Sequence, residues 1–290
     1  MKKNIIILVV LLLILIIALA VYFLFRPTQP PVSIIFKPDN NVKRSFNDVE
    51  MSNGNYIVTE MNSIDENSRL LRISPKGAMT VITTYSGQLR GLTTDGSDFI
   101  ATGIDPSGGN VLLRIAQNGT TSIIASSISG GGALTDVAVL GSDYIVADPA
   151  NERLLRITPD GTVSTFASSP GGYLRGIKAV NNEIIVAGGY GECLGRLYRV
   201  SADGTVSIIA SETTLYICSA YSSVAPDGSD FIVNSGSNTG FKRIKPDGTI
   251  IDIINPDIGL ATGPVGLLVR GTDIIVADGS PATLFRIAIP

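Results

Sequence analysis

The sequence contains no histidine and no tryptophan, and only two of its 290 residues are cysteines. Without histidine the chain cannot build a histidine general base, a histidine metal ligand or a Ser-His nucleophile. The lysines and arginines also form no cluster, so we expect no nucleic-acid partner, because a phosphate-tracking surface needs one. Together these absences exclude several enzyme classes.

An unbroken apolar run of 21 residues, from position 5 to 25, opens the chain. A helix of this length crosses a hydrocarbon core of about 30 Å. Lys2 and Lys3 precede the run and Arg26 follows it, which favours a cytoplasmic N-terminus. A cleaved signal peptide is the alternative, because Ala18-Leu-Ala20 offers a cleavage pattern. The bulky residues that continue the run favour an uncleaved anchor.

We therefore expect three parts: a transmembrane signal anchor at 1–26, a proline-rich linker at 27–31 and a globular domain at 32–290. The expected location is a cytoplasmic or plasma membrane, with a single pass and the domain on the extracytoplasmic side. The domain carries 19 basic and 25 acidic residues, a net charge of −6.

A pattern of Leu or Phe, any residue, Arg, and Ile or Val recurs six times beyond the linker. Its arginines are separated by 42, 42, 43, 44 and 43 residues, at Arg72, Arg114, Arg156, Arg199, Arg243 and Arg286. β-Branched runs lie on both sides of each copy, and turns ending in Gly, such as Pro159-Asp-Gly161, follow five of them. Four short strands in about 43 residues, repeated without helical periodicity, predict a six-bladed all-β propeller of four-stranded antiparallel blades.

The sixth copy ends before a fourth strand. The sequence of residues 32–36, VSIIF, closely matches residues 206–210, VSIIA, which is the fourth strand of the fourth copy. We therefore predict that the N-terminal strand completes the last blade and removes its open edge. The outer strand of a blade starts at the face of the propeller opposite the one at which the inner strand starts. We call the face at the start of the inner strands the mouth. With this closure, we expect the mouth to point away from a membrane at the N-terminus.

The third copy, DYIVADPANERLLRITPDG, resembles the NHL-type repeat, and weaker likeness extends over residues 32–290. The resemblance implies a six-bladed fold shared with the gluconolactonase/lactonase group, strictosidine-synthase-like proteins and streptogramin lyases, which include enzymes and binding scaffolds. It also implies that the acidic residue ending a second strand, such as Asp148, supports the next loop and faces the repeat arginine. We interpret Asp148 and the six arginines as structural.

Residues that differ between the copies are the candidates for specificity. Aligned at the start of the inner strands they are Asn47, Asp48, Arg90, Asp136 and Arg175. Acidic and basic groups alternate over four blades, and two interpretations stay open. The side chains form ion pairs between neighbouring blades, or they form a ligand-binding mouth whose arginines bind an anionic group.

The resemblance suggests one enzyme, because metal-dependent lactonases gather Glu, Asn and Asp around a divalent ion in the channel. Asn47, Asp48 and Asp136 are of suitable types, but Arg90 and Arg175 at equivalent positions disfavour a cation. We therefore predict no metal, no cofactor and no catalytic residue. The preferred function is a binding scaffold for a protein, glycan or small anion, and a lactonase-like hydrolase is the alternative.

The two cysteines fall in loops on the mouth side of neighbouring copies. Cys193 lies between the second and third strands of the fourth copy, and Cys218 lies in the connection to the fifth. In an oxidising exterior they could form a disulfide. Two free buried thiols are the alternative.

Overall fold

The computed structural model describes residue 15 and residues 31–38, 44–62, 67–128, 131–168, 172–190, 194–213, 221–235, 240–254, 264–279 and 281–289. Residues 31–290 form a compact unit separate from residues 1–30. The predicted anchor lies almost wholly outside the described residues, and so do Cys193 and Cys218, so the disulfide stays a prediction. In the described part, no helix is both long and apolar enough to cross a membrane.

The predicted six-bladed propeller is confirmed, because residues 31–290 form six antiparallel sheets of four strands each. The first three blades comprise β2 (Arg44–Ser52), β3 (Asn55–Asn62), β4 (Ser68–Ile73) and β5 (Met79–Tyr85); β6 (Gln88–Asp95), β7 (Asp98–Ile104), β8 (Asn110–Ile115) and β9 (Thr121–Ala125); and β10 (Val137–Leu140), β11 (Asp143–Asp148), β12 (Arg153–Ile157) and β13 (Val163–Ser168).

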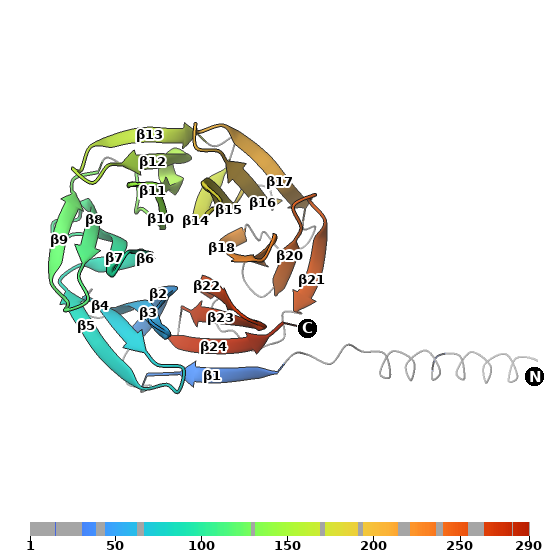
Figure 1. Cartoon of the computed structure of the whole chain (residues 1–290), viewed down its shortest axis with the longest axis horizontal. Helices are drawn as coiled ribbons and strands as arrows, with labels where there is room; N and C mark the ends of the chain where they lie inside the picture. The colour runs from blue at the N-terminus through green and yellow to red at the C-terminus, as the bar shows by residue number, and fades with distance from the viewer. Residues whose placement is uncertain are drawn as a thin grey trace, which may run out of the picture. The chain divides into compact units, whose positions relative to one another are not determined.

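The other three blades follow the same order. They comprise β14 (Tyr173–Val180), β15 (Glu183–Tyr190), β16 (Leu194–Val200) and β17 (Val206–Thr213); β18 (Tyr221–Asp227), β19 (Asp230–Ser235), β20 (Phe241–Ile244) and β21 (Ile250–Ile254); and β22 (Pro264–Arg270), β23 (Asp273–Asp278), β24 (Thr283–Ala288) and the N-terminal β1 (Val32–Phe36). The inner strands lie around the centre of the ring, which we call the channel, and each contacts the inner strands of the two neighbouring blades (Figure 1).

The core lies between the blades. Each of six hydrophobic clusters joins the facing sheets of two neighbouring blades. Both faces of a blade are therefore covered, which explains why the second strands read as continuous apolar runs such as Ile145-Val-Ala147. Burial of an aliphatic side chain contributes about 1.5–3 kcal/mol, so the packing of neighbouring blades is the main source of stability.

The predicted closure by the N-terminal strand is also confirmed. β1 pairs antiparallel with β24, with Val32 opposite Ile287, and it forms the outer edge of the sixth blade (Figure 1). Phe36 also stacks on Phe46 of the first blade, with ring centroids 6.3 Å apart. The N-terminal strand therefore stabilises both blades at the closure.

The turns between third and fourth strands need glycine for two reasons. Gly119 and Gly161 have φ values of +89° and +87°, a region that side-chain-bearing residues rarely adopt. A Cβ at Gly119 would also lie 2.2 Å from the Ile82 carbonyl oxygen, on the outer strand of the preceding blade. Gly77 approaches Ile35 of β1 in the same way, at 2.5 Å. Each turn thus fits against its neighbour through backbone alone.

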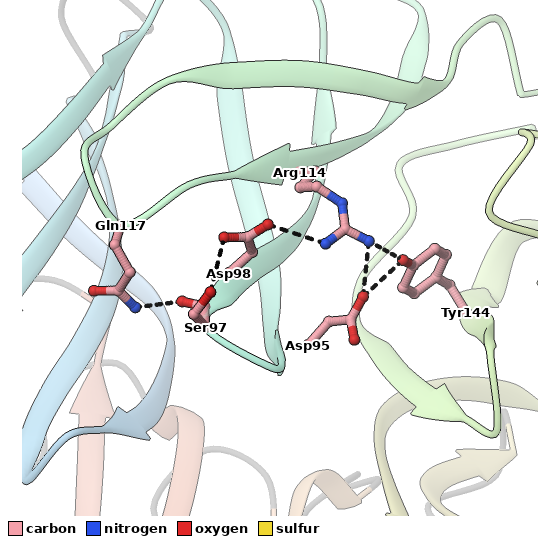
Figure 2. A network of polar contacts seen from close by, with 6 residues as sticks. All are labelled: Asp95, Ser97, Asp98, Arg114, Gln117 and Tyr144. Carbon is pink, nitrogen blue, oxygen red and sulfur yellow. Dashed lines mark hydrogen bonds and ion pairs between the residues drawn. The ribbon is translucent and has the colours of Figure 1, made fainter.

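Five of the six repeat arginines lie within 4 Å of an acidic residue at the turn between the first and second strands of their blade, whereas Arg72 donates to Gln117 of the next blade. Figure 2 shows Arg114 paired with Asp95 at 2.8 Å and with Asp98 at 3.1 Å. The same guanidinium donates to the hydroxyl of Tyr144 in the next blade, and that hydroxyl donates to Asp95 over 2.9 Å. The network therefore joins two blades, which agrees with a structural role.

One expectation from the resemblance is wrong. Asp148 does not face Arg156, because it accepts a hydrogen bond of 2.8 Å from Arg153 at the start of the third strand. Arg156 lies at the other end of the strand, 3.7 Å from Asp143. The antiparallel register explains the difference, since Asp148 is opposite Arg153 and Arg156 is opposite Ile145, near the far turn. Asp148 does support its loop, because Asn151 also donates to it over 2.9 Å.

Candidate functional site

A cavity of about 250 Å³ lies at the mouth of the channel, and we call it the mouth cavity. Four of the five predicted site residues, Asn47, Asp48, Asp136 and Arg175, line it. Arg90 is not among the residues that line it. The fold therefore brings four of the five candidate residues to one cavity, and Arg90 lies outside its lining.

β-Bulges shape the wall of the cavity. The register of β2 with β3 shifts between Phe46 and Asp48, so Asn47 has no partner in the ladder. The register of β14 with β15 shifts in the same way between Leu174 and Gly176, at Arg175. A bulge turns a side chain out of the regular alternation. This local irregularity directs Arg175 toward the cavity.

Asp48 and Asp136 hold neighbouring blades together. The two oxygens of Asp48 accept hydrogen bonds of 2.8 Å from the backbone amides of Val49 and of Leu92, in the next blade. Asp136 has the same arrangement between the third and fourth blades, where its two oxygens accept 2.7 Å hydrogen bonds from the backbone amides of Val137 and Ile177. Both carboxyl groups are buried. A buried backbone amide that loses its strand partner at a bulge needs another hydrogen-bond acceptor. Asp48 and Asp136 provide this acceptor, so the first role of the two carboxyl groups is structural.

The predicted ion pairs are not formed. Within the described residues no ion pair joins Asp48 to Arg90 or Asp136 to Arg175. The Arg90 guanidinium instead donates to Gln88 over 2.9 Å. The Arg175 side chain is exposed and has no hydrogen-bond or ion-pair partner among the described residues. The alternation of charges is therefore not a neutralising ring.

The main charged contact of the channel was not predicted. Lys178 on β14 donates to Glu50 on β2, so the ion pair crosses the channel from the fourth blade to the first. The two side chains are 15 % and 19 % exposed, and Lys178 also lines the mouth cavity. Side chains two residues apart share one face of a strand. Glu50 lies two residues after Asp48, and Lys178 lies two residues after Gly176. The alignment of the inner strands therefore already indicated that these two side chains share the face of Asp48 and Gly176.

Electrostatic effects link these groups. Burial raises the pKa of Asp136 to about 6 and that of Asp48 well above its usual value, while the positive charge of Lys178 and the backbone amides act in the opposite direction. The pKa of Lys178 is raised by Glu50, Asp48 and Asp136, which outweigh its burial. Lys178 therefore stays charged and is a poor general base.

The rim of the cavity has the groups expected of a binding site. Tyr173 is 49 % exposed and lines the cavity near Arg175 on the same strand. The Ser222 hydroxyl, on the wall, accepts a 2.7 Å hydrogen bond from Asn234. The cavity thus combines an aromatic ring, an unpaired cation, hydroxyl groups and a carboxylate-rich floor. An aromatic face and convergent polar groups are typical of small-ligand sites.

Comparisons with known proteins identify the fold only. No family model matches the sequence, and no curated protein matches it. A catalytically inactive histidine-to-alanine variant of virginiamycin B lyase from Staphylococcus aureus, solved with quinupristin, has a TM-score of 0.63 at 15 % identity, over 90 % of this chain and 99 % of that one.

Two further solved structures differ in function. A gluconolactonase from Xanthomonas campestris has a TM-score of 0.61 at 13 % identity, over 91 % of this chain and 99 % of that one. A chain of a nidogen/laminin complex has a TM-score of 0.59 at 11 % identity, over 82 % and 86 %. These likenesses agree with the propeller fold that the repeat suggested. Since they include enzymes and a protein complex, function has to be argued from the site.

Proposed function

We propose that this protein is a binding propeller that takes a small anionic ligand, such as an acidic sugar of a glycan, in the mouth cavity. The observation that carries the proposal is the unpaired, exposed guanidinium of Arg175 at the rim of a cavity of about 250 Å³. A guanidinium binds a carboxylate or phosphate through two parallel hydrogen bonds. The volume suits a small molecule or one terminal residue of a larger one.

The other cavity residues support an acidic sugar over an inorganic ion. Tyr173 offers a ring face on which a sugar can pack, as amphipathic aromatic side chains do. Deeper in the cavity Asp48 and Asp136 provide acceptors for hydroxyl groups. A ligand with a negative group at one end and hydroxyls at the other would satisfy both regions.

We further propose that the protein works outside the cytoplasmic membrane, held by the anchor at 1–26. The direction of β1 shows at which face of the propeller the chain enters. Val32 pairs with Ile287, near the end of β24, whereas Thr283 begins β24 opposite Asp278 on the mouth side. The chain therefore enters the propeller at the face opposite the mouth cavity.

The experiment compares Arg175→Ala with Arg90→Ala. Both arginines lie at bulges of inner strands, but only Arg175 lines the cavity. Residues 27–290 would be screened by thermal shift against glucuronate, galacturonate, neuraminate and their neutral counterparts, with affinities then measured by calorimetry. We expect acidic sugars to bind and Arg175→Ala to weaken binding at least tenfold, since bonds to charged groups contribute about 1.5–3 kcal/mol. Equal losses in both variants would refute the assignment of Arg175.

A lactonase-like hydrolase remains the second candidate, favoured by the structural likeness to the Xanthomonas campestris gluconolactonase. Hydrolysis of sugar lactones, assayed with Ca²⁺, Mn²⁺ or Zn²⁺ and lost in Asp136→Asn, would establish it. A His-dependent lyase reaction is excluded because the chain has no histidine. We expect no lactone hydrolysis above that of a buffer control.

A further inference from the structure

Two arginines of the first blade converge on one carboxylate. Arg44 begins β2, where the inner strand starts at the mouth, Glu60 lies near the end of β3, and Arg69 lies near the start of β4 (Figure 1). The Oε2 atom of Glu60 accepts hydrogen bonds of 2.6 Å from Nη1 of Arg44 and of 2.6 Å from Nε of Arg69. The two donor nitrogens therefore lie within twice that distance of each other. We call Arg44 and Arg69 the blade-1 arginine pair.

The pair carries an excess of positive charge. In the part of the chain that the structure describes, Glu60 is the only carboxylate that two basic side chains share. The reverse holds at Arg114, Lys242 and Arg243, each of which contacts two carboxylates. Burial raises the pKa of Glu60 to about 7, although Arg44 acts in the opposite direction. At neutral pH the carboxylate therefore neutralises at most one of the two guanidinium groups.

Only one of the two arginines belongs to the repeat. Glu60 is opposite Arg69 in the ladder, as Asp148 is opposite Arg153 in the third blade. Arg44 has no such counterpart. The residues at its position in the next three blades are glycines, Gly87, Gly132 and Gly172. The other copies thus support this loop without a second arginine, and Arg44 is particular to the first blade.

Both guanidinium groups keep donors for a ligand. The side chains of Arg44 and Arg69 are 20 % and 24 % exposed. Neither has a hydrogen-bond or ion-pair partner other than Glu60 among the described residues. A guanidinium has five N–H donors, so the shared carboxylate oxygen leaves several of them unused. Bonds from such half-buried groups to an anion are stronger than bonds in open water.

We propose that the blade-1 arginine pair binds a sulfate or phosphate group of a ligand at the mouth of the propeller. The oxygens of a tetrahedral oxyanion point in several directions, so one group can accept hydrogen bonds from both guanidiniums. Its charge also offsets the repulsion between the two cations, which Glu60 relieves only in part. Neither arginine lines the mouth cavity. The inference therefore goes beyond the proposed function and does not depend on Arg175.

The test is calorimetric titration of sodium sulfate into the full chain in a non-ionic detergent, at constant ionic strength. Every protein, the parent included, would carry Arg175→Ala, so that an anion in the mouth cavity does not contribute. Arg44→Gln removes the extra cation and leaves the ion pair that the repeat needs. Arg153→Gln is the matched control, because it removes a guanidinium at the position equivalent to Arg69, where Asp148 contacts a single described arginine.

We expect Arg44→Gln to weaken sulfate binding at least tenfold, since hydrogen bonds to charged groups contribute about 1.5–3 kcal/mol, and Arg153→Gln to leave it unchanged. Glu60→Gln should strengthen binding, because it removes a competing negative charge at nearly constant size. Equal affinities of Arg44→Gln and its parent, or no sulfate binding by the parent, would overturn the proposal. Weaker binding by Glu60→Gln would also overturn it, and this measurement does not need Arg44→Gln to fold.

A sulfated chondroitin disaccharide and glycerol 3-phosphate distinguish the two sources of the oxyanion. The ligand that binds more tightly than inorganic sulfate, and loses this affinity in Arg44→Gln, identifies the natural group. Binding of both ligands that Arg44→Gln leaves unchanged would count against the site.

Discussion

The contact between a turn glycine and the preceding blade leads to a quantitative prediction on stability. Gly119→Ala and Gly141→Ala both place a side chain at positive φ, at +89° and +64°. This strain costs about 1–2 kcal/mol at each position. Only Gly119 also faces a steric conflict, since its Cβ would lie 2.2 Å from the Ile82 carbonyl oxygen, whereas Gly141 has no atom within 4 Å.

The backbone of one blade must therefore move in Gly119→Ala but not in Gly141→Ala. Overpacking of this kind costs about 1–3 kcal/mol. We expect Gly141→Ala to lose about 1–2 kcal/mol and Gly119→Ala about 2–5 kcal/mol, the sum of strain and conflict. For a chain of this size, each 1 kcal/mol corresponds to about 2 °C in the unfolding midpoint.

Urea unfolding followed by circular dichroism and by tyrosine fluorescence would measure both losses. The two probes must give coincident transitions for the comparison to hold. If the two variants lost equal stability, the close approach between blades would contribute nothing and the argument from the Cβ position would be refuted. If Gly141→Ala lost more, the strain at positive φ would dominate instead.

Three other predictions concern charge, coupling and closure. Because the pKa of Asp136 is raised to about 6 from 3.8, the native state binds its proton more tightly, and the free energy of unfolding should fall as pH rises from 4 to 6. The total decrease in the free energy of unfolding, up to about 3 kcal/mol, should be smaller in Asp136→Asn. Equal decreases in the two proteins would contradict the raised pKa of Asp136. A double-mutant cycle of Arg114→Ala and Tyr144→Phe should give a coupling of about 1 kcal/mol by urea unfolding, and no coupling would mean that their contact does not join the blades. Deletion of residues 1–36 should leave the edge of β24 open and produce oligomers in size-exclusion chromatography, whereas a monomer of unchanged stability would show that β1 is dispensable.

The sequence predicted the repeated parts of the molecule because each copy reinforces the others. The spacing of the arginines established the number of blades, and the likeness of residues 32–36 to residues 206–210 established the closure. Local patterns of turn and strand were enough, since a blade is built from neighbouring residues in the chain.

The site was predicted only in part because it depends on contacts between distant blades. Position in the alignment placed Asp48 and Arg175 at the mouth, but it could not show that Asp48 binds an amide of the next blade or that Arg90 turns toward Gln88. The ion pair between Glu50 and Lys178 joins residues that are 128 positions apart. The residue types and their spacing indicate that both side chains point toward the channel. Whether they reach each other depends on the diameter of the channel, which the sequence does not give.

The closure of the ring also affects the order in which the protein can fold. β1 is the first strand of the propeller to be synthesised, yet its partner β24 is the last, since Val32 pairs with Ile287. Pairings of such sequence separation form slowly, and a chain emerging from the ribosome can assemble the first five blades before the sixth exists. During that interval the edge of β1 has no native partner. The ring therefore cannot close in the native way until β24, its last strand, has been synthesised.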